Sequence, residues 1–220
     1  MGQRLKWTAA ERARLGRLVK SVIDIVGALV LLVVTFPLMA LVTAAIGASM
    51  GRPILFRQDR VGLGGRSFTL LKFRTMRPVH SGADELASDN QRLTALGRVL
   101  RACSLDELPQ LWNVLRGDMS LVGPRPLLTQ YVGRYSSRQA RRHEVKPGLT
   151  GLAQVRGRNG LSWEERFELD VWYVDHQSVG LDLKILLRTA VSVFGGRGVS
   201  APGHATMPEF LGSGHADGVR

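Results

Sequence analysis

The feature that most constrains this chain is an uncharged, apolar run of 26 residues from Ile25 to Met50. About 20 apolar residues in a helix already cross the hydrocarbon core of a bilayer. The run is longer than the apolar core of a signal peptide, and no small-residue cleavage pattern follows it. We therefore expect a retained helix inside the membrane.

Two details argue against a simple spanning helix. Pro37 lies in the middle of the run, where it removes a helical hydrogen bond and kinks the chain. Residues 1–20 carry six lysines or arginines against one acid, and residues 52–77 carry seven against one. Because positive charge concentrates on the cytoplasmic side, a helix that enters, breaks at Pro37 and leaves by the same face satisfies both flanks. The hydroxyl of Thr35 is the nearest group that could satisfy the backbone at the break. A kinked helix that spans the membrane remains the alternative.

The formal net charge of +12 predicts an anionic partner. Nucleic acid, anionic lipid and phosphorylated metabolites all fit this charge. No aromatic interleaving or docking motif accompanies the arginines, so nucleic-acid binding is disfavoured. A single cysteine, Cys103, excludes an internal disulfide and suits a reducing compartment.

The pattern predicts a mostly helical α+β fold in which amphipathic helices at the membrane interface and a small β-hairpin surround one catalytic domain. We expect three parts: a basic segment with the re-entrant membrane helix (1–51), a membrane-associated cytosolic catalytic domain (52–194) and an extended tail (195–220). Within the domain, glycines between short apolar stretches predict a hairpin, and apolar periodicity with capping residues predicts helices. The predicted elements are a hairpin within 53–79 and helices over 93–102, 104–116, 163–175 and 181–194. The capping-box pattern Ser162-Trp163-Glu164-Glu165 marks the start of the 163–175 helix.

Two adjacent acids, Asp106 and Glu107, lie in the predicted first turn of the 104–116 helix. Ser104 followed by Glu107 is a capping-box pattern, although Pro109 could instead mark the first turn. Acidic residues in a first turn often only complement the helix dipole. Taken alone, the pair could therefore be a cap or a catalytic site.

A rigid turn follows the acids. Gly123-Pro124-Arg125-Pro126 restricts the backbone on both sides of Arg125, because each proline fixes its own φ and limits the residue before it. A guanidinium held in this way suits two-pronged contacts with phosphate. The alternative is a stiff loop with a solvated arginine.

Four stretches carry a family resemblance: Lys72-Phe73-Arg74-Thr75-Met76, Arg101 through Pro126, Lys146 through Val155, and Phe167 through Tyr173. With these stretches in this order after a proline-broken apolar run, the chain resembles the bacterial sugar transferases called monotopic phosphoglycosyl transferases, and its length resembles their minimal members.

The resemblance implies a reaction. Members transfer a phospho-sugar from a nucleoside diphosphate sugar, usually a UDP-sugar, to a polyprenyl phosphate, with release of the nucleoside monophosphate. They act at the cytoplasmic face of the bacterial inner membrane, require Mg²⁺ and form a covalent phospho-sugar intermediate. Their membrane element is a re-entrant helix-break-helix, often with Ser-Pro at the break, where this chain has Thr35-Phe36-Pro37.

The resemblance also implies roles for residues. Asp106 matches the nucleophile and magnesium ligand, and Glu107 its partner toward the lipid phosphate. The residues matched to phosphate or nucleotide binding are Lys72, Arg101 and Arg125, the last within its Pro124 and Pro126 turn.

A rival hypothesis from another class is a non-enzymatic, membrane-anchored basic protein that binds acidic lipid or nucleic acid. The carboxylate pair beside Arg125 disfavours it, because an anion binder has no use for adjacent acids. No residue specifies the sugar, and the oligomeric state stays open.

Overall fold

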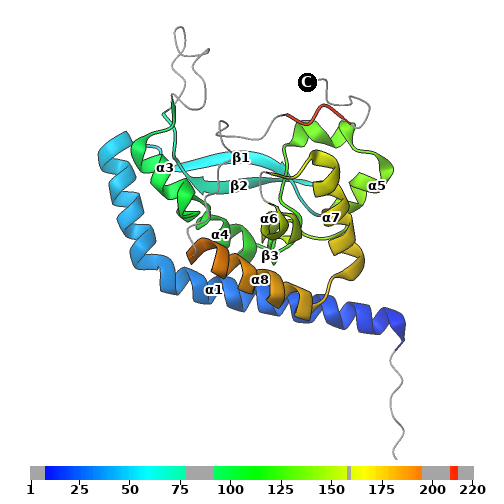
Figure 1. Cartoon of the computed structure of the whole chain (residues 1–220). Coiled ribbons are helices and arrows are strands. Elements are labelled where there is room, and N and C mark those ends of the chain that lie inside the picture. The colour runs from blue at the N-terminus through cyan, green and yellow to red at the C-terminus, as the bar shows by residue number, and fades with distance from the viewer. Residues whose placement is uncertain (1–7, 78–91, 158–159, 195–208, 213–220) are drawn as a thin grey trace, which may run out of the picture.

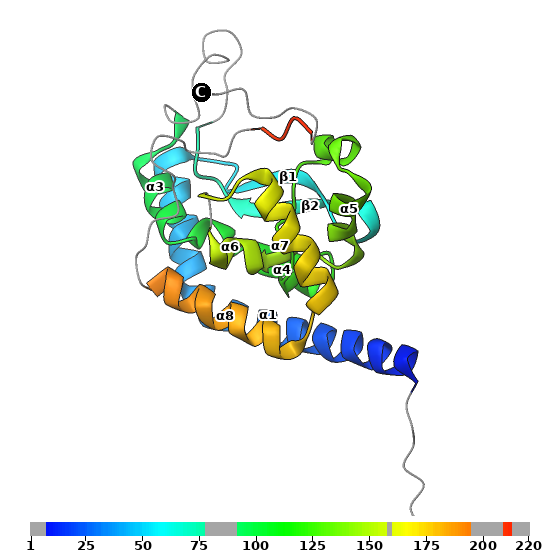
Figure 2. The same cartoon turned by 45° about the vertical axis from the view of Figure 1, so that its right-hand side comes forward.

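A single helix of 42 residues, α1 (Ala9–Met50), runs along the domain that the rest of the chain forms (Figures 1 and 2). The computed structural model describes residues 8–77, 92–157, 160–194 and 209–212. Within that part, α1 is the one helix long and apolar enough to cross a membrane, with a mean hydropathy of 2.8 and only 11% of its most apolar window buried in the protein. A core helix would be covered by protein, so this apolar surface needs another apolar phase. The predicted long apolar helix is confirmed.

The helix is not straight. Figures 1 and 2 show α1 following the base of the domain and then turning up along its side. Its first half places Ala28 in one core cluster, and its second half places Val42 and Ile46 in another. Pro37 lies inside the helix between these two contact regions, where the loss of a backbone donor permits a bend.

Thr35 does not serve the backbone group that Pro37 frees. Its hydroxyl donates to the carbonyl of Leu31 at 2.7 Å. The carbonyl that lacks its helical N–H donor is that of Val33, four residues before Pro37. Thr35 therefore binds a carbonyl two residues before the one that Pro37 leaves without a donor.

The predicted hairpin is confirmed. Strands β1 (Leu55–Val61) and β2 (Ser67–Phe73) pair antiparallel, and the 3₁₀ turn η1 (Leu63–Gly65) joins them. A second, parallel pair consists of β3 (Ser120–Val122) and β4 (Gly148–Thr150). The described part is thus a mostly helical α+β fold, as predicted, and the parallel β3–β4 pair is a second small sheet that the sequence analysis did not predict.

Helices cover these sheets (Figure 1). In the described residues α1 is followed by the α-helices α3 (Ala95–Ala102), α4 (Gln110–Leu115), α5 (Ser137–Ala140), α6 (Leu152–Arg156), α7 (Trp163–His176) and α8 (Val179–Phe194). The same part of the chain also contains the 3₁₀ turns η2 (Leu105–Glu107), η3 (Thr129–Arg134) and η4 (Arg141–Glu144). The helices predicted over 93–102, 163–175 and 181–194 are confirmed. The Ser162–Glu165 capping box of α7 is present as the sequence suggests. Of the tail 195–220, only 209–212 lies within the described residues.

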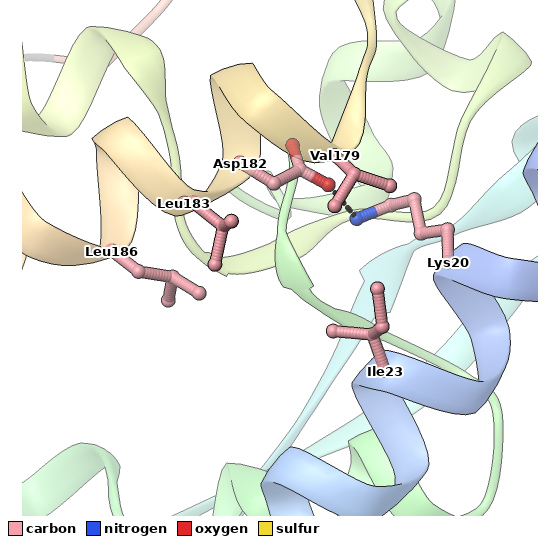
Figure 3. A pocket seen from close by; sticks show the side chains of 6 residues that line it. All are labelled: Lys20, Ile23, Val179, Asp182, Leu183 and Leu186. Carbon is pink, nitrogen blue, oxygen red and sulfur yellow. Dashed lines mark hydrogen bonds and ion pairs between the residues drawn. The ribbon is translucent and has the colours of Figure 1, made fainter.

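Helix α8 lies beside α1 in both views (Figures 1 and 2). Figure 3 shows the seam between them, where the ammonium of Lys20 points at the carboxylate of Asp182, 2.6 Å away. The same carboxylate accepts a 2.7 Å hydrogen bond from the hydroxyl of Tyr173. The cavity at this seam measures about 10 Å³, room for roughly one water. It is therefore an inter-helix joint and too small for a substrate.

The outer face of α8 is apolar. Leu183, Leu187 and Val191 follow one another at four-residue spacing and are 57%, 67% and 67% exposed. This spacing puts them on one helix face. Together with the uncovered surface of α1, they form an exposed apolar surface on two neighbouring helices, as expected of an amphipathic helix at an interface.

Arg74 closes the C-terminus of α1. It is 7% exposed, and its Nη2 donates to the carbonyls of Met50 and Gly51, each at 2.6 Å. Carbonyls in the last turn of a helix lack internal donors, so a buried guanidinium at that position satisfies them. Arg74 thereby joins the end of β2 to the end of the apolar helix.

We expect Arg74→Met to lower the free energy of unfolding by about 2 kcal/mol, because it removes a buried guanidinium and its two charge-assisted hydrogen bonds to the helix end. Thermal unfolding of the detergent-purified protein measures the change. Arg57→Met, at an exposed position of β1, is the matched control and should change stability by less than about 0.5 kcal/mol. Equal stability of the two variants would contradict the capping role of Arg74.

Candidate active site

The two acids lie on a tight 3₁₀ turn between α3 and α4. Ser104 has φ 57°, the left-handed region, and its side chain makes no capping bond. The predicted Ser104–Glu107 capping box is therefore wrong, and so is the 104–116 helix start: Pro109 is the N-cap of α4, close to the alternative that the sequence allowed. The physical reason is that the carboxylate of Glu107 binds two cations, and such charge-assisted contacts are stronger than a bond to a backbone N–H.

Glu107 joins the two predicted cations. Its Oε1 accepts hydrogen bonds from Lys72 Nζ and from Arg125 Nη2, both at 2.8 Å. Burial alone would raise the pKa of Glu107, but Arg125 and Lys72 outweigh it and hold the pKa far below its usual range. In turn, Glu107 raises the pKa of Arg125. Glu107 therefore stays ionised and holds two cations at the site.

Asp106 lies next to this bridge and is differently placed. It is 7% exposed, and its Oδ2 is 3.9 Å from Lys72 Nζ. Burial raises its pKa above the usual value; Lys72 opposes this effect and the charge of Glu107 adds to it. Two neighbouring carboxylates thus have pKa values moved in opposite directions, as is common where acids have different tasks.

Lys72 is positioned by a side chain that pairs with the edge of β2. The fully buried amide of Asn113, in α4, accepts from the N–H of Leu71 at 3.1 Å and donates to the carbonyl of Thr69 at 2.8 Å. An edge strand leaves such groups unpaired unless another element binds them. Asn113 therefore fixes β2, and with it Lys72, against the helix that follows the acids.

The turn that carries Arg125 is held by backbone contacts. Gly123 N–H donates to Thr150 O and Gly148 N–H donates to Pro124 O, both at 2.9 Å. A Cβ on Gly148 would lie 2.0 Å from Gly123 N, so only glycine permits this approach. The Lys146–Val155 stretch is thus a backbone support for the Pro124-Arg125-Pro126 turn.

Arg101 reaches the site from the last turn of α3. Its Nε donates to Thr75 Oγ1 at 3.1 Å. Its charge is one of those that oppose the rise in the pKa of Asp106 caused by burial. The structure thus brings Lys72, Asp106, Glu107 and Arg125 together, with Arg101 beside them. Thr35 and Pro37 lie in α1, outside this cluster.

The residues present fit a magnesium ion in a limited way. In the described part of the chain no group of three or more His, Cys, Asp or Glu side chains could enclose a metal. Magnesium commonly needs only one or two carboxylates and completes its shell with substrate phosphate and water. The carboxylate of Asp106 accepts no hydrogen bond from the described residues, so its lone pairs are available to a cation, whereas Glu107 is already engaged.

Sequence reasoning missed three charged residues near Arg125. Arg60, in β1, donates to Pro126 O at 3.4 Å, and burial together with Arg125 lowers its pKa to about 10. Arg142 and Asp170 form a buried ion pair of 2.7 Å behind the turn. Asp170 lies in a stretch that carries the family resemblance, but only the fold shows that Arg142 meets it.

Comparison with known proteins gives one consistent result. The family model described as bacterial sugar transferase matches residues 15–196. An uncharacterized sugar transferase, EpsL, of Bacillus subtilis is 50% identical over 90% of this chain and 98% of its own length. The UDP-glucose:undecaprenyl-phosphate glucose-1-phosphate transferase of Caulobacter vibrioides is 47% identical over 79% of this chain and 69% of its own length. The exopolysaccharide production protein ExoY of Rhizobium meliloti is 36% identical over 84% and 89%.

The opposite pKa shifts predict opposite effects of neutralising each acid. A carboxyl whose folded pKa is raised destabilises the fold when ionised, so Asp106→Asn should keep or raise the melting temperature at pH 7. Glu107 has a lowered pKa, so its stabilisation is full above its unfolded pKa of 4.5 and is lost as pH falls below it. Glu107→Gln should therefore cost about 2 to 3 kcal/mol at pH 7, a loss that shrinks below pH 4.5.

Thermal unfolding of both variants and the wild type at pH 7 and at several values below pH 5 measures these effects. Both substitutions remove one charge with little change in shape, so each is the control for the other. A destabilised Asp106→Asn variant beside a stable Glu107→Gln variant would contradict the electrostatic assignment.

Proposed function

The chain belongs to the bacterial sugar transferase family, and from that premise we propose that it transfers a phospho-sugar from a UDP-sugar to a polyprenyl phosphate, with release of UMP. It is a phosphoglycosyl transferase, and names of relatives supply both substrate classes. The observation that carries the proposal is the Asp106–Glu107 pair beside Lys72 and Arg125, in a domain whose neighbouring helices expose an apolar surface. A non-enzymatic anion binder explains neither that pair nor the family match.

The reaction proceeds in two steps. A carboxylate oxygen of Asp106 attacks the sugar-bearing phosphorus, the bond from that phosphorus to the bridging oxygen breaks, and UMP leaves with the bond's electron pair. An oxygen of the polyprenyl phosphate then attacks the same phosphorus and releases the Asp106 carboxylate. Aspartate is an established type of nucleophile toward phosphorus. The open lone pairs of Asp106 and the cations around it support this assignment.

The other residues position and neutralise. Phosphoryl transfer asks mainly for alignment and for charge stabilisation on the phosphoryl oxygens. Lys72 and Arg125 supply positive charge, and Glu107 holds both in place; its low pKa makes it a weak proton acceptor. Magnesium bound by Asp106 and the diphosphate would neutralise the developing charge on the leaving phosphate.

We also propose that α1 is re-entrant and that the domain lies on the cytoplasmic face of the bacterial inner membrane. Residues from Lys20 to Ile46 contact the domain, a path of about 40 Å along the axis of the bent helix. A bilayer core is only about 30 Å thick, so a helix that crossed it could not touch a domain on one side over that length. The basic flanks at both ends of α1 support the same geometry.

Asp106→Asn should reduce transfer by at least about a thousandfold, because the loss of a nucleophile costs more than about 4 kcal/mol of barrier. UMP release from a panel of UDP-sugars, with an undecaprenyl phosphate acceptor, measures the reaction and identifies the sugar. With donor alone, the wild type should gain the mass of one phospho-sugar at Asp106. Substantial transfer by a folded Asp106→Asn protein, or a quenched wild type without the adduct, would contradict the covalent route.

Topology is tested with single cysteines in a Cys103→Ser background. Gly16→Cys and Arg57→Cys lie before and after the apolar segment, at positions open to a reagent. Both should react with a membrane-impermeant maleimide in inverted vesicles and remain unlabelled in intact spheroplasts. If the two positions label from opposite sides, α1 spans the membrane.

A further inference from the structure

A buried ion pair lies directly behind the turn that presents Arg125. Arg142, in η4, and Asp170, in α7, have side chains 1% and 3% exposed. Arg142 donates to Asp170 Oδ2 from Nη2 at 2.7 Å and from Nε at 3.1 Å. Burying two charges costs much of what their attraction returns, so such a pair is weak evidence for a purely stabilising role.

The same guanidinium binds the backbone of Arg125. Arg142 Nη2 also donates to Arg125 O at 2.8 Å. Arg125 is therefore held at both ends, by Arg142 through its carbonyl and by Glu107 through its guanidinium. Asp170 fixes the angle of Arg142, because one carboxylate oxygen takes two prongs of the planar fork.

We propose that Arg142 is a positioning residue that sets the backbone of Arg125 for phosphate binding, and that the docked C-terminal segment 209–212 keeps Arg142 in place. The catalytic part of this proposal rests on the function proposed above. A lysine at position 142 would keep the charge toward Asp170, but its single nitrogen cannot reproduce the fork.

An aromatic cluster encloses the guanidinium. Its carbon Cζ lies 5.9 Å from the ring centre of Tyr135 and 5.5 Å from that of Phe167. Phe210 packs on both rings, with centre distances of 5.8 and 5.0 Å, and is only 2% exposed. Packed rings over a buried cation restrict its motion and stabilise its charge.

The C-terminal segment is docked by polar contacts as well. Glu209 Oε1 accepts from Arg134 Nη1 at 2.8 Å and from Gln130 Nε2 at 3.0 Å, and Arg134 also donates to Phe210 O. The segment thus closes the cluster from outside the domain core. A contact path runs from Phe210 through the rings to Arg142 and on to Arg125.

A double-mutant cycle separates positioning from general stability. Arg142→Lys should lower kcat/KM by about tenfold or more in the wild type and by less than about twofold in an Arg125→Lys background, because residues that act through one another are not additive. Phe210→Ala should follow the same pattern with a smaller loss. Arg138→Lys is the matched control, because Arg138 pairs with Glu168 of α7 at the surface, where the two side chains are 68% and 59% exposed. This substitution should leave kcat/KM unchanged both in the wild type and in the Arg125→Lys background.

Hydrogen–deuterium exchange over 123–127 supplies a readout that does not depend on activity. Arg142→Lys and Phe210→Ala should each speed exchange there, and Arg138→Lys should leave it unchanged. If the wild type were inactive toward every UDP-sugar, the proposed function would be refuted. Hydrogen–deuterium exchange would still test whether Arg142 holds the backbone of residues 123–127. Additive losses in the cycle, or unchanged exchange in Arg142→Lys, would overturn the positioning role. If Arg142→Lys does not fold, Phe210→Leu, which keeps an apolar side chain, carries both measurements.

Discussion

The site depends on one carboxylate shared between two cations. Lys72 comes from the hairpin, Glu107 from the 3₁₀ turn and Arg125 from the proline-bounded turn, and these segments are distant in the chain. Without the carboxylate of Glu107, the charges of Lys72 and Arg125 would repel each other. Without the two cations, burial of the ionised carboxylate would carry a large desolvation cost. Their combination is therefore stable only when all three segments are in place. Asp106 has only a longer contact in this group, 3.9 Å from its Oδ2 to Lys72 Nζ.

The second constraint is the way α1 is joined to the domain. Lys20 pairs with Asp182 near one end, Asp24 accepts the N–H of Leu121, and Arg74 caps the other end. Ala28, Val42 and Ile46 of α1 are also buried against the domain, whereas most of the other apolar side chains of α1 remain exposed. Helix α1 therefore exposes an apolar surface on one side and packs against the domain on the other. Because Lys72 lies in β2 and Arg74 directly follows that strand, one short segment connects the apolar helix to the charged site.

Local signals predicted much of the fold. Glycines between alternating stretches identified the β1–β2 hairpin, and the Ser162–Glu165 capping box identified the start of α7. The same type of signal failed at Ser104–Glu107, because there the glutamate has a stronger partner far away in sequence. A capping pattern is reliable only where no distant charge competes for the acid. The importance of Gly148 was likewise hidden, since its reason is the backbone of Gly123 from another segment.

The sequence by itself determined the apolar helix, the basic flanks, the adjacent acids and the stiff turn around Arg125, because each depends on residues that are neighbours along the chain. Only the tertiary structure decided that Glu107 rather than Asp106 accepts the close hydrogen bonds of both cations, that Asn113 fixes β2, and that Arg142 binds the backbone of Arg125. Those outcomes depend on burial and on contacts between distant segments, and neither is encoded in local spacing. A buried charge has its properties from whatever the fold packs against it.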